Sequence, residues 1–495
     1  MRKNDVIITF LFFIVMGVSS IFNEVFELSR WGLFYLLNIS LGIYLIHFVI
    51  NAYKKKNTFF KLLFWYIVIQ FGLFTLAGNL YFFVNQDLNI SPYVNELRVF
   101  DMNKSMLLAC LGAIILINIF NNEQMVFNLG VKCALKLPWN KRREYRINHI
   151  FIFILMIILI VGAVFAVSSG YIGFADADFI ASGGYENINN VMQYIYLIVP
   201  TIQMVTCVYY YYYLKSKWSI LNVSFLLMCI YALFQVVVFT LAGMKSLSLR
   251  LFVECLLIFF LYKGKINKNN LIISCSFLYV LYNYVETFRN LLRSGEYNGL
   301  QGRLLALAAS ITSMLHITQD GVVGNSNFIK ALAYRLTTTE DGALVIRYKD
   351  EIGITATDPN FLSDFLLAPI ATFLPRIFFP WKSVYNYGEW CTHMVYRAPD
   401  FLLYGSDLST HGYFYLAGGI LFVVIGYIFL GYVLNFCSGV LFTKDSTEIL
   451  KIIPFVIIIF NTLISTQSPT EIIASCLRSV ILFPLICRCL LIAKY

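Results

Sequence analysis

Charged residues are scarce in this sequence, too scarce for a protein that folds in water. Asp, Glu, Lys and Arg make up 13% of the 495 residues, whereas 59% are hydrophobic. Soluble domains contain roughly a quarter charged and about half apolar residues. A soluble fold has no core large enough to hide this much apolar surface. The composition therefore predicts an integral membrane protein.

The sequence also lacks the short patterns that mark several enzyme classes. It contains no GxxxxGK[ST], HExxH or GxSxG pattern and no CxxC pair, so it does not support nucleotide hydrolysis, zinc hydrolysis or an elbow serine. The triplet Asp176-Ala177-Asp178 is too little to indicate a metal. Nearly all of the eleven cysteines lie in or beside apolar segments, and only Cys391 lies in a long polar region. We expect no disulfide framework, no bound metal and no cofactor.

Apolar runs of about 17–25 residues recur along nearly the whole chain and predict an all-α protein with about twelve transmembrane helices. The first run follows Arg2 and Lys3, but no small-residue cleavage site follows it, so we interpret it as a span and not as a signal peptide. The predicted spans lie near residues 6–22, 31–50, 59–79, 105–120, 149–168, 191–213, 219–242, 247–262, 270–289, 411–436, 450–465 and 471–492.

The basic residues lie mostly in short connections between these runs, and under this count they fall on one side of the membrane. The positive-inside rule makes that side cytoplasmic and places both termini there, as expected of a multi-pass membrane protein. A net charge of +10 distributed in this way indicates orientation in a bilayer and not nucleic-acid binding. The basic connections are Arg2/Lys3, Lys54–Lys56, Lys132–Arg146, Lys215/Lys217 and Lys263/Lys265/Lys268.

The region from about 290 to 410 breaks the apolar pattern. Its glycines and prolines are turn signals, and its aromatic content argues against disorder. Two amphipathic pieces, Leu304–Ile317 and Phe361–Phe373, could lie on the membrane surface or cover a cavity. We therefore divide the chain into helices one to nine (1–289), a large extracytoplasmic loop (290–410) and helices ten to twelve (411–495).

Several charges fall inside or at the ends of predicted spans, where they are costly. Arg250 and Glu254 share a helix face at i, i+4 spacing. This pair either neutralises itself or, together with Lys245, forms a cationic rim aimed at an anionic group at the outer leaflet. Arg289 and Arg293 either form a similar rim or extend to the interface. Arg478 lies deep in the last predicted span, which favours a functional or paired role.

The large loop mixes basic residues with carboxylates and histidines. Arg335, Arg376 and Lys382 could hold an anion, and a carboxylate or imidazole near a reacting hydroxyl could move a proton. Each residue taken alone reads as a solvated loop charge. Their concentration on the side of the membrane that also presents Lys245 and Arg289 favours a catalytic loop.

Three segments in the second half of the chain carry recognisable motifs. The stretch Phe373 to Lys382 (FLPRIFFPWK), late in the large loop, contains Pro-Arg, a short apolar run, Pro and Lys. Leu241 to Ser246 (LAGMKS) has the pattern of a Gly-x-Lys-Ser hairpin, and glycines recur in the predicted helix from His411 to Leu434 after the loop. All three resemble segments of the Wzy-type family of O-antigen and capsular polysaccharide repeat-unit polymerases, in which Arg is commoner at the position of Lys245. The resemblance covers the chain from about residue 220 to the end.

The resemblance implies a GT-C-like membrane glycosyltransferase. Such an enzyme transfers the growing glycan from undecaprenyl pyrophosphate to the next lipid-linked repeat unit at the outer face. The resemblance thereby implies a location in the bacterial inner (plasma) membrane. Expected partners are the lipid-linked oligosaccharide, membrane lipids, a chain-length regulator and a flippase. An O-antigen ligase, and a flippase or other transporter of lipid-linked glycan, remain alternatives. A membrane acyltransferase is disfavoured because His47 and His149 have no fitting neighbours.

The resemblance also implies roles for particular residues. Two cations of the loop, with Arg289 or Lys245, would neutralise the leaving pyrophosphate, and a carboxylate or histidine that follows them would take the acceptor's proton. The expected catalytic residues are Arg376, Lys382, Glu389, His393 and Asp400. The expected substrate-binding residues are Lys245, Arg250, Arg289, Arg293, Arg335 and Arg478.

Overall fold

The computed structural model of the protein divides the chain into two compact units. Unit 1 comprises Met1–Leu137, Gly324–Lys444 and Asn461–Ile481, and unit 2 comprises Pro138–Val323, Asp445–Phe460 and Leu482–Tyr495. The residues that the structure describes are 30–54, 58–80, 98–135, 144–168, 185–216, 222–241, 245–263, 268–293, 299–317, 338–355, 358–371, 387–397, 408–441, 448–464 and 468–493.

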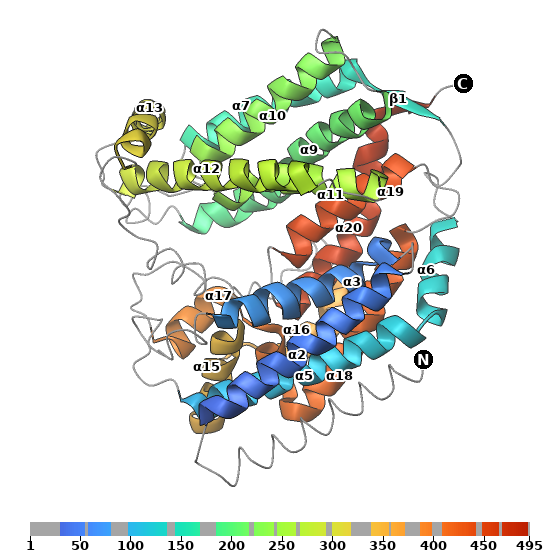
Figure 1. The fold of residues 1–495 in the computed structure, drawn as a ribbon, viewed down its shortest axis with the longest axis vertical. Coiled ribbons are helices and arrows are strands. Elements are labelled where there is room, and N and C mark those ends of the chain that lie inside the picture. The colour runs from blue at the N-terminus through green and yellow to red at the C-terminus, as the bar shows by residue number, and fades with distance from the viewer. Residues whose placement is uncertain are drawn as a thin grey trace. The chain divides into compact units, whose positions relative to one another are not determined.

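The described residues are almost all helical, as the composition predicts (Figure 1). Helices form at eleven of the twelve predicted spans, and the remaining one, 6–22, lies outside the described residues. Within the described residues, six helices are long and apolar enough to cross a membrane. These six are Trp31–Tyr53, Leu62–Leu80, Val99–Asn122, Val223–Leu241, Thr410–Leu441 and Pro469–Cys489. The chain is therefore a multi-pass membrane protein, and the full count of twelve spans stays a prediction.

Unit 1 is built from long apolar helices and the shorter helices of the 338–397 region. Its first half contains α2 (Arg30–Tyr53), η1 (Thr58–Phe60), α3 (Leu62–Ile67), the π-helix η2 (Val68–Ala77), α5 (Val99–Asn122) and α6 (Met125–Leu135). Its second half contains α15 (Thr338–Glu351), α16 (Phe361–Ala371), α17 (Tyr387–Trp390), the π-helix η4 (Cys391–Val395) and α18 (Thr410–Leu441). The π-helix η5 (Ile459–Leu463) and α20 (Pro469–Cys489) contribute residues to both units.

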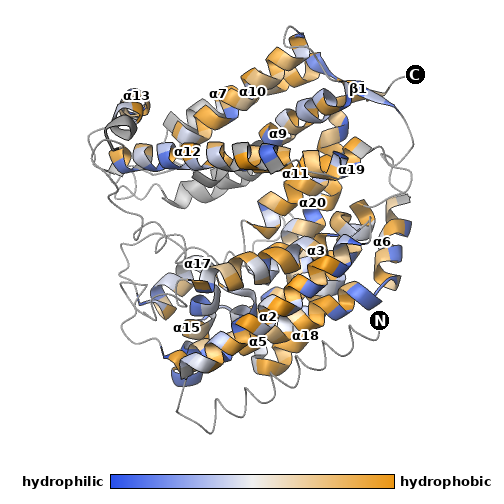
Figure 2. Cartoon of the chain, in the orientation of Figure 1, coloured by the Kyte–Doolittle hydropathy of each residue, from blue (hydrophilic) through white to orange (hydrophobic). Residues whose placement is uncertain are grey.

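Helix α2 shows why this unit suits a bilayer. Phe34 and Leu41 are fully buried against the rest of unit 1, whereas Ile39, Ile43 and Ile46 on the other side are 55–62% exposed. A helix with apolar residues on both faces needs protein on one side and lipid on the other. Figure 2 shows the same apolar covering on α5 and α18, which pack beside each other, while hydrophilic residues mark α15.

Glycines let the apolar helices of unit 1 approach closely. A side chain at Gly130 of α6 or at Gly439 of α18 would overlap backbone of the facing helix, and one at Gly112 of α5 would overlap the ring of Tyr427. Small residues at such crossings are common between membrane helices, because they let the two backbones pack directly. The glycine spacing after residue 411 therefore serves helix packing in this fold.

Helix α18 is not one continuous rod. Gly418 and Gly419 have non-helical backbone angles, and Gly419 has a φ of +70°, which favours glycine. In a straight helix Phe414 and Tyr427 would be about 19 Å apart along the axis, yet their ring centroids are 5.2 Å apart. Residues 410–417 therefore fold back along the segment from 420 to 441. The prediction of one continuous span at 411–436 is therefore corrected in part. Only the second segment is long enough to cross a bilayer of about 30 Å, and the span begins after Gly419.

The part of the 290–410 region that the structure describes contains the amphipathic helices that the sequence predicts. Leu304–Ile317 falls within α13 (Gly299–Ile317) of unit 2, and most of Phe361–Phe373 forms α16 of unit 1. Phe361 packs its ring on Trp390 and Tyr413, so this part of unit 1 has its own aromatic core. Its position relative to the membrane stays a prediction.

Unit 2 is a second helical bundle, closed by a short two-stranded ribbon. Strand β1 (Tyr145–Ile147) pairs antiparallel with β2 (Leu491–Ala493), and the Tyr212 hydroxyl donates to the Tyr145 carbonyl. The helices of the unit, besides α13, are α7 (His149–Ser168), α9 (Tyr185–Ser216), α10 (Val223–Leu241), α11 (Lys245–Lys263), α12 (Lys268–Arg293) and α19 (Glu448–Ile458).

Candidate functional site

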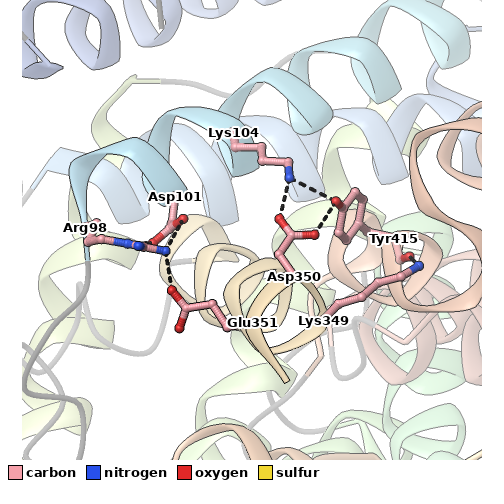
Figure 3. Close-up of polar contacts among 7 residues, drawn as sticks. All are labelled: Arg98, Asp101, Lys104, Lys349, Asp350, Glu351 and Tyr415. Carbon is pink, nitrogen blue, oxygen red and sulfur yellow. Dashed lines mark hydrogen bonds and ion pairs between the residues drawn. The ribbon is translucent and has the colours of Figure 1, made fainter. Parts of the chain in front are cut away.

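Unit 1 contains a cluster of charged side chains where α5, α15 and α18 meet (Figure 3). The Lys104 ammonium lies 2.5 Å from Asp350 Oδ2 and 2.9 Å from the Tyr415 hydroxyl, which in turn donates to Asp350 over 2.7 Å. The three groups close a triangle that joins three helices. Such a network holds the end of the polar helix α15 firmly against two apolar helices.

Lys349 binds the backbone at the fold-back of α18. Its ammonium donates to the carbonyl oxygens of Tyr415 (2.5 Å) and Leu416 (3.2 Å), and it lies 5.0 Å from the centre of the Tyr415 ring. These carbonyls lie at the end of the 410–417 segment, where helical partners run out because the helix breaks at Gly418. Desolvation lowers the pKa of Lys349 from its ordinary value. Lys349 therefore serves as a cap that fixes the fold-back.

A more exposed ion-pair network extends the cluster toward solvent. Arg98 pairs with Asp101 over 2.8 Å and with Glu351 over 2.7 Å, and Arg347 pairs with the same Glu351 over 2.9 Å. The hydrogen bond from Arg347 lowers the pKa of the Glu351 carboxyl group, and the hydrogen bond to Asp101 raises the pKa of Arg98. Exposed pairs of this kind contribute little to stability, so their main effect is local electrostatic balance.

A serine and a histidine meet under α15, deeper in unit 1. Ser105 Oγ of α5 lies 2.8 Å from His411 Nε2 of α18, and both residues are almost fully buried. A side chain at Gly342 of α15 would overlap both groups. The glycine thus lets the α15 backbone pack directly on this hydrogen bond, which ties the start of the folded-back segment to α5.

The first turn of α15 carries two carboxyl groups. Glu340 is 1% exposed, and the Tyr396 hydroxyl of the segment that follows η4 donates to Asp341. Burial raises the pKa of Glu340 to about 8, and the neighbouring Asp341 adds to the shift. Burial also raises the pKa of Tyr396 well above its ordinary value. A carboxyl group whose proton leaves near neutral pH can act as an acid or a base.

Helix α15 carries a buried carboxyl group near its start and cations near its end. Glu340 and Asp341 lie in the first turn of α15, and Lys349 and Arg347 lie near its last turn. The helix packs against α5, α18, η2 and η4. The carboxyl groups of the first turn can accept or supply a proton, whereas both cations are bound to partners within the chain.

Three of the site residues predicted from the sequence have described side chains. His393 is half-buried on η4, which packs against α15. Arg478 is exposed on α20, within the part that belongs to unit 1. Arg250 is 8% exposed on α11 of unit 2, on the same helix face as the fully buried Glu254.

The other predicted site residues cannot be compared with the structure in the same way. Helices carry Glu389 (α17), Lys245 (α11), Arg289 and Arg293 (both α12), but their side chains lie outside the description. Arg335, Arg376, Lys382 and Asp400 lie outside the described residues, as do Asp176 and Asp178. Four of the predicted substrate-binding residues belong to unit 2, namely Lys245, Arg250, Arg289 and Arg293, and the rest of the predicted site residues belong to unit 1.

Sequence reasoning missed several members of the unit 1 cluster. Lys104 and Ser105 stand at the start of an apolar run, and Tyr415 reads as an ordinary membrane aromatic. The available signal was the lysine itself, because a cation beside a predicted span needs a partner or an interface. Glu340 and Lys349 look in the sequence like ordinary charged residues of the large loop.

The fold and the site define the class of this chain as a multi-pass helical membrane protein. Among the described residues, no group of three or more His, Cys, Asp or Glu side chains is placed to hold a metal ion. No family model, curated protein or solved structure matches the chain.

Proposed function

We propose that this chain is a membrane glycosyltransferase that polymerises lipid-linked oligosaccharide repeat units into O-antigen or capsular polysaccharide. The observation that carries the proposal is the polar helix α15, which brings a buried carboxyl group and cations into a unit made of apolar membrane helices. The resemblance of the 373–382 and 241–246 segments to repeat-unit polymerases supports the same function. The substrate would be oligosaccharide on undecaprenyl pyrophosphate.

In the proposed reaction, a hydroxyl oxygen of the acceptor repeat attacks the anomeric carbon of the donor chain. The bond from that carbon to the pyrophosphate oxygen breaks, and the electron pair leaves with the lipid pyrophosphate. Arg376 and Lys382 would neutralise this leaving group, with Lys245 or Arg289 as further cations. No metal or cofactor is proposed.

The acceptor's proton needs a base near the reacting hydroxyl. Glu389, His393 and Asp400 are the candidates from the sequence, and the segment that carries them includes Tyr396, which is hydrogen-bonded to Asp341. Helix α15 packs on η4. A base in this segment could then pass the proton on to the carboxyl groups of Glu340 and Asp341 in the neighbouring helix α15.

The experiment is complementation of a strain that lacks this gene. Wild type, Arg376→Ala and the matched control Arg146→Ala, an exposed residue of strand β1, are compared at equal protein level. A gel of surface polysaccharide and lipid-linked intermediates is the readout. We expect a full ladder with wild type and control, and single repeat units with Arg376→Ala.

Other outcomes would assign the chain differently. A normal ladder without the gene, or with Arg376→Ala, contradicts the proposal. Polymer that stays on the lipid carrier in the deletion strain would indicate a ligase. Repeat units trapped on the cytoplasmic side would indicate a flippase. The buried Arg250 and Glu254 of unit 2 favour this alternative, because charged residues buried in a membrane protein mark many transport paths.

A further inference from the structure

Three neighbouring helices of unit 2 turn polar side chains toward one another inside an otherwise apolar bundle. Helix α10 contributes Tyr231 and Gln235, one turn apart, and α11 contributes Arg250 and Glu254 at the same spacing. Helix α9 contributes residues 206–209, and the three helices pack against one another. Residues three or four apart share a helix face, so each helix presents a short polar stripe.

Hydrogen bonds and a ring contact connect these stripes into a row. The Cys207 thiol donates to Glu254 Oε2 over 3.8 Å, and the hydroxyl of the adjacent Thr206 donates to Gln235 Oε1 over 3.2 Å. One turn further along α10, the ring of Tyr231 lies 5.5 Å from that of Tyr209.

The row ends at an exposed histidine. The Tyr209 hydroxyl lies 2.9 Å from Nδ1 of His149, the first residue of α7. His149 is exposed, whereas Glu254, Gln235 and Tyr231 are at most 4% exposed. The row therefore runs from a buried carboxyl group to the end of the bundle.

Three buried polar atoms along this row have no hydrogen-bond partner among the described residues. They are Oε1 of Glu254, Nε2 of Gln235 and the hydroxyl oxygen of Tyr231. A buried polar atom without a partner destabilises the fold, and buried water commonly supplies the missing hydrogen bond. These atoms lie on the connected row, so water bound to them would make the row continuous.

We propose that unit 2 binds a file of water along this row and moves protons between Glu254 and His149. The Glu254 carboxylate takes a proton from a hydronium ion that reaches its Oε1 atom, which leaves neutral water, and becomes a carboxylic acid. The acid then gives the proton to the next water, hydroxyl groups and water pass it to Nδ1 of His149, and the imidazolium releases a proton from Nε2 to bulk water. Only O–H and N–H bonds form and break, and each cycle moves one proton and restores every group.

Other ionisable groups near Glu254 set its charge. Arg250 on its own helix favours the carboxylate, and burial opposes it. Helix α19 packs against α9 and α11 and carries charged residues in its first turn. The Cys207 thiol donates to the Glu254 carboxyl group, and Cys255, the next residue along α11, also interacts with it electrostatically. The charged residues in the first turn of α19 are Glu448 and Lys451.

The test is proton flux through the purified full-length chain in phospholipid vesicles that contain a pH-sensitive dye. A potassium gradient with valinomycin drives the flux. Wild type is compared with Glu254→Gln and with Glu144→Gln, an exposed residue ahead of strand β1. We expect Glu254→Gln to lose roughly tenfold or more of the flux, because an amide cannot exchange the proton, while Glu144→Gln keeps it.

A second measurement covers the case in which Glu254→Gln fails to fold. The wild-type chain in membranes is treated with a hydrophobic carbodiimide, which attacks protonated carboxyl groups in apolar surroundings. Mass spectrometry should find Glu254 modified, with less modification as pH rises, and flux should fall in step.

Two outcomes would overturn the proposal: wild-type flux no greater than that of empty vesicles, or modification of Glu254 without loss of flux. Glu254 and Arg250 would then only neutralise each other's charge. Arg376→Ala, which tests polymerisation, should conduct protons like wild type, so the two proposals fail separately.

Discussion

Replacement of Glu340 by Gln tests whether unit 1 holds a neutral carboxyl group at working pH. Glu340 is 1% exposed, and burial raises its pKa from 4.5 to about 8. Between these two values the folded chain holds a proton that the unfolded chain has released. The contribution of this group to stability is therefore fully present below pH 4.5 and is lost as the pH rises through 8.

The magnitude follows from the size of the shift. Each pH unit within the interval lowers the free energy of unfolding by about 1.4 kcal/mol, or ~5 kcal/mol across it. Gln cannot ionise but has nearly the same shape as the protonated Glu. Glu340→Gln should therefore remove this slope and leave other pH effects unchanged.

The assay is thermal unfolding of the purified chain in detergent, followed by tryptophan fluorescence from pH 5 to 9. The unfolding temperature of wild type should fall steeply as the pH rises toward 8, and that of Glu340→Gln should fall much less. The matched control is Glu471→Gln, an exposed residue of α20, which should follow wild type. Parallel curves for wild type and Glu340→Gln would refute the reasoning.

Two further predictions concern the contacts of α15. Gly342→Ala should destabilise unit 1 by about 1–3 kcal/mol, because the new methyl group overlaps buried neighbours on α5 and α18. The control is Gly72→Ala, where a methyl group meets nothing within 4 Å. Equal unfolding temperatures for the two variants would contradict the prediction. Lys349→Met should leave two carbonyl oxygens of α18 without their donor and lower the unfolding temperature clearly, whereas Arg347→Met on the same helix loses an exposed ion pair and should change it little. Tryptophan fluorescence in detergent measures both, and a larger effect at Arg347 would reverse the assignment.

Hydropathy located the helices well because a bilayer imposes the same demand on every span. Each crossing needs about twenty apolar residues with all backbone groups bonded internally, so runs such as 105–120 and 219–242 could be read directly. The fold-back of α18 could not be read in this way. Both of its segments are apolar, and only the packing of Phe414 against Gly426 and Tyr427 shows that the chain reverses.

The candidate site was only partly visible from the sequence. Its charges could be seen, but Glu340, Lys349 and Arg347 look alike as loop residues. The first is buried, the second binds carbonyl oxygens and the third is in an exposed ion pair. Burial and partners distinguish them. The carbonyl partners of Lys349 lie 66 and 67 residues further along the chain, whereas Arg347 pairs with Glu351 on its own helix.

The sequence by itself determined that this protein is helical and multi-pass, because apolar runs of bilayer length permit little else. It also supplied the cationic segments on which the proposed polymerase rests. The tertiary structure alone decided which polar groups meet. Lys104 joins Asp350 and Tyr415 across gaps of 246 and 311 residues, and the polar row of unit 2 draws on four helices. Such encounters follow from the packing of whole helices against one another, which local composition does not encode.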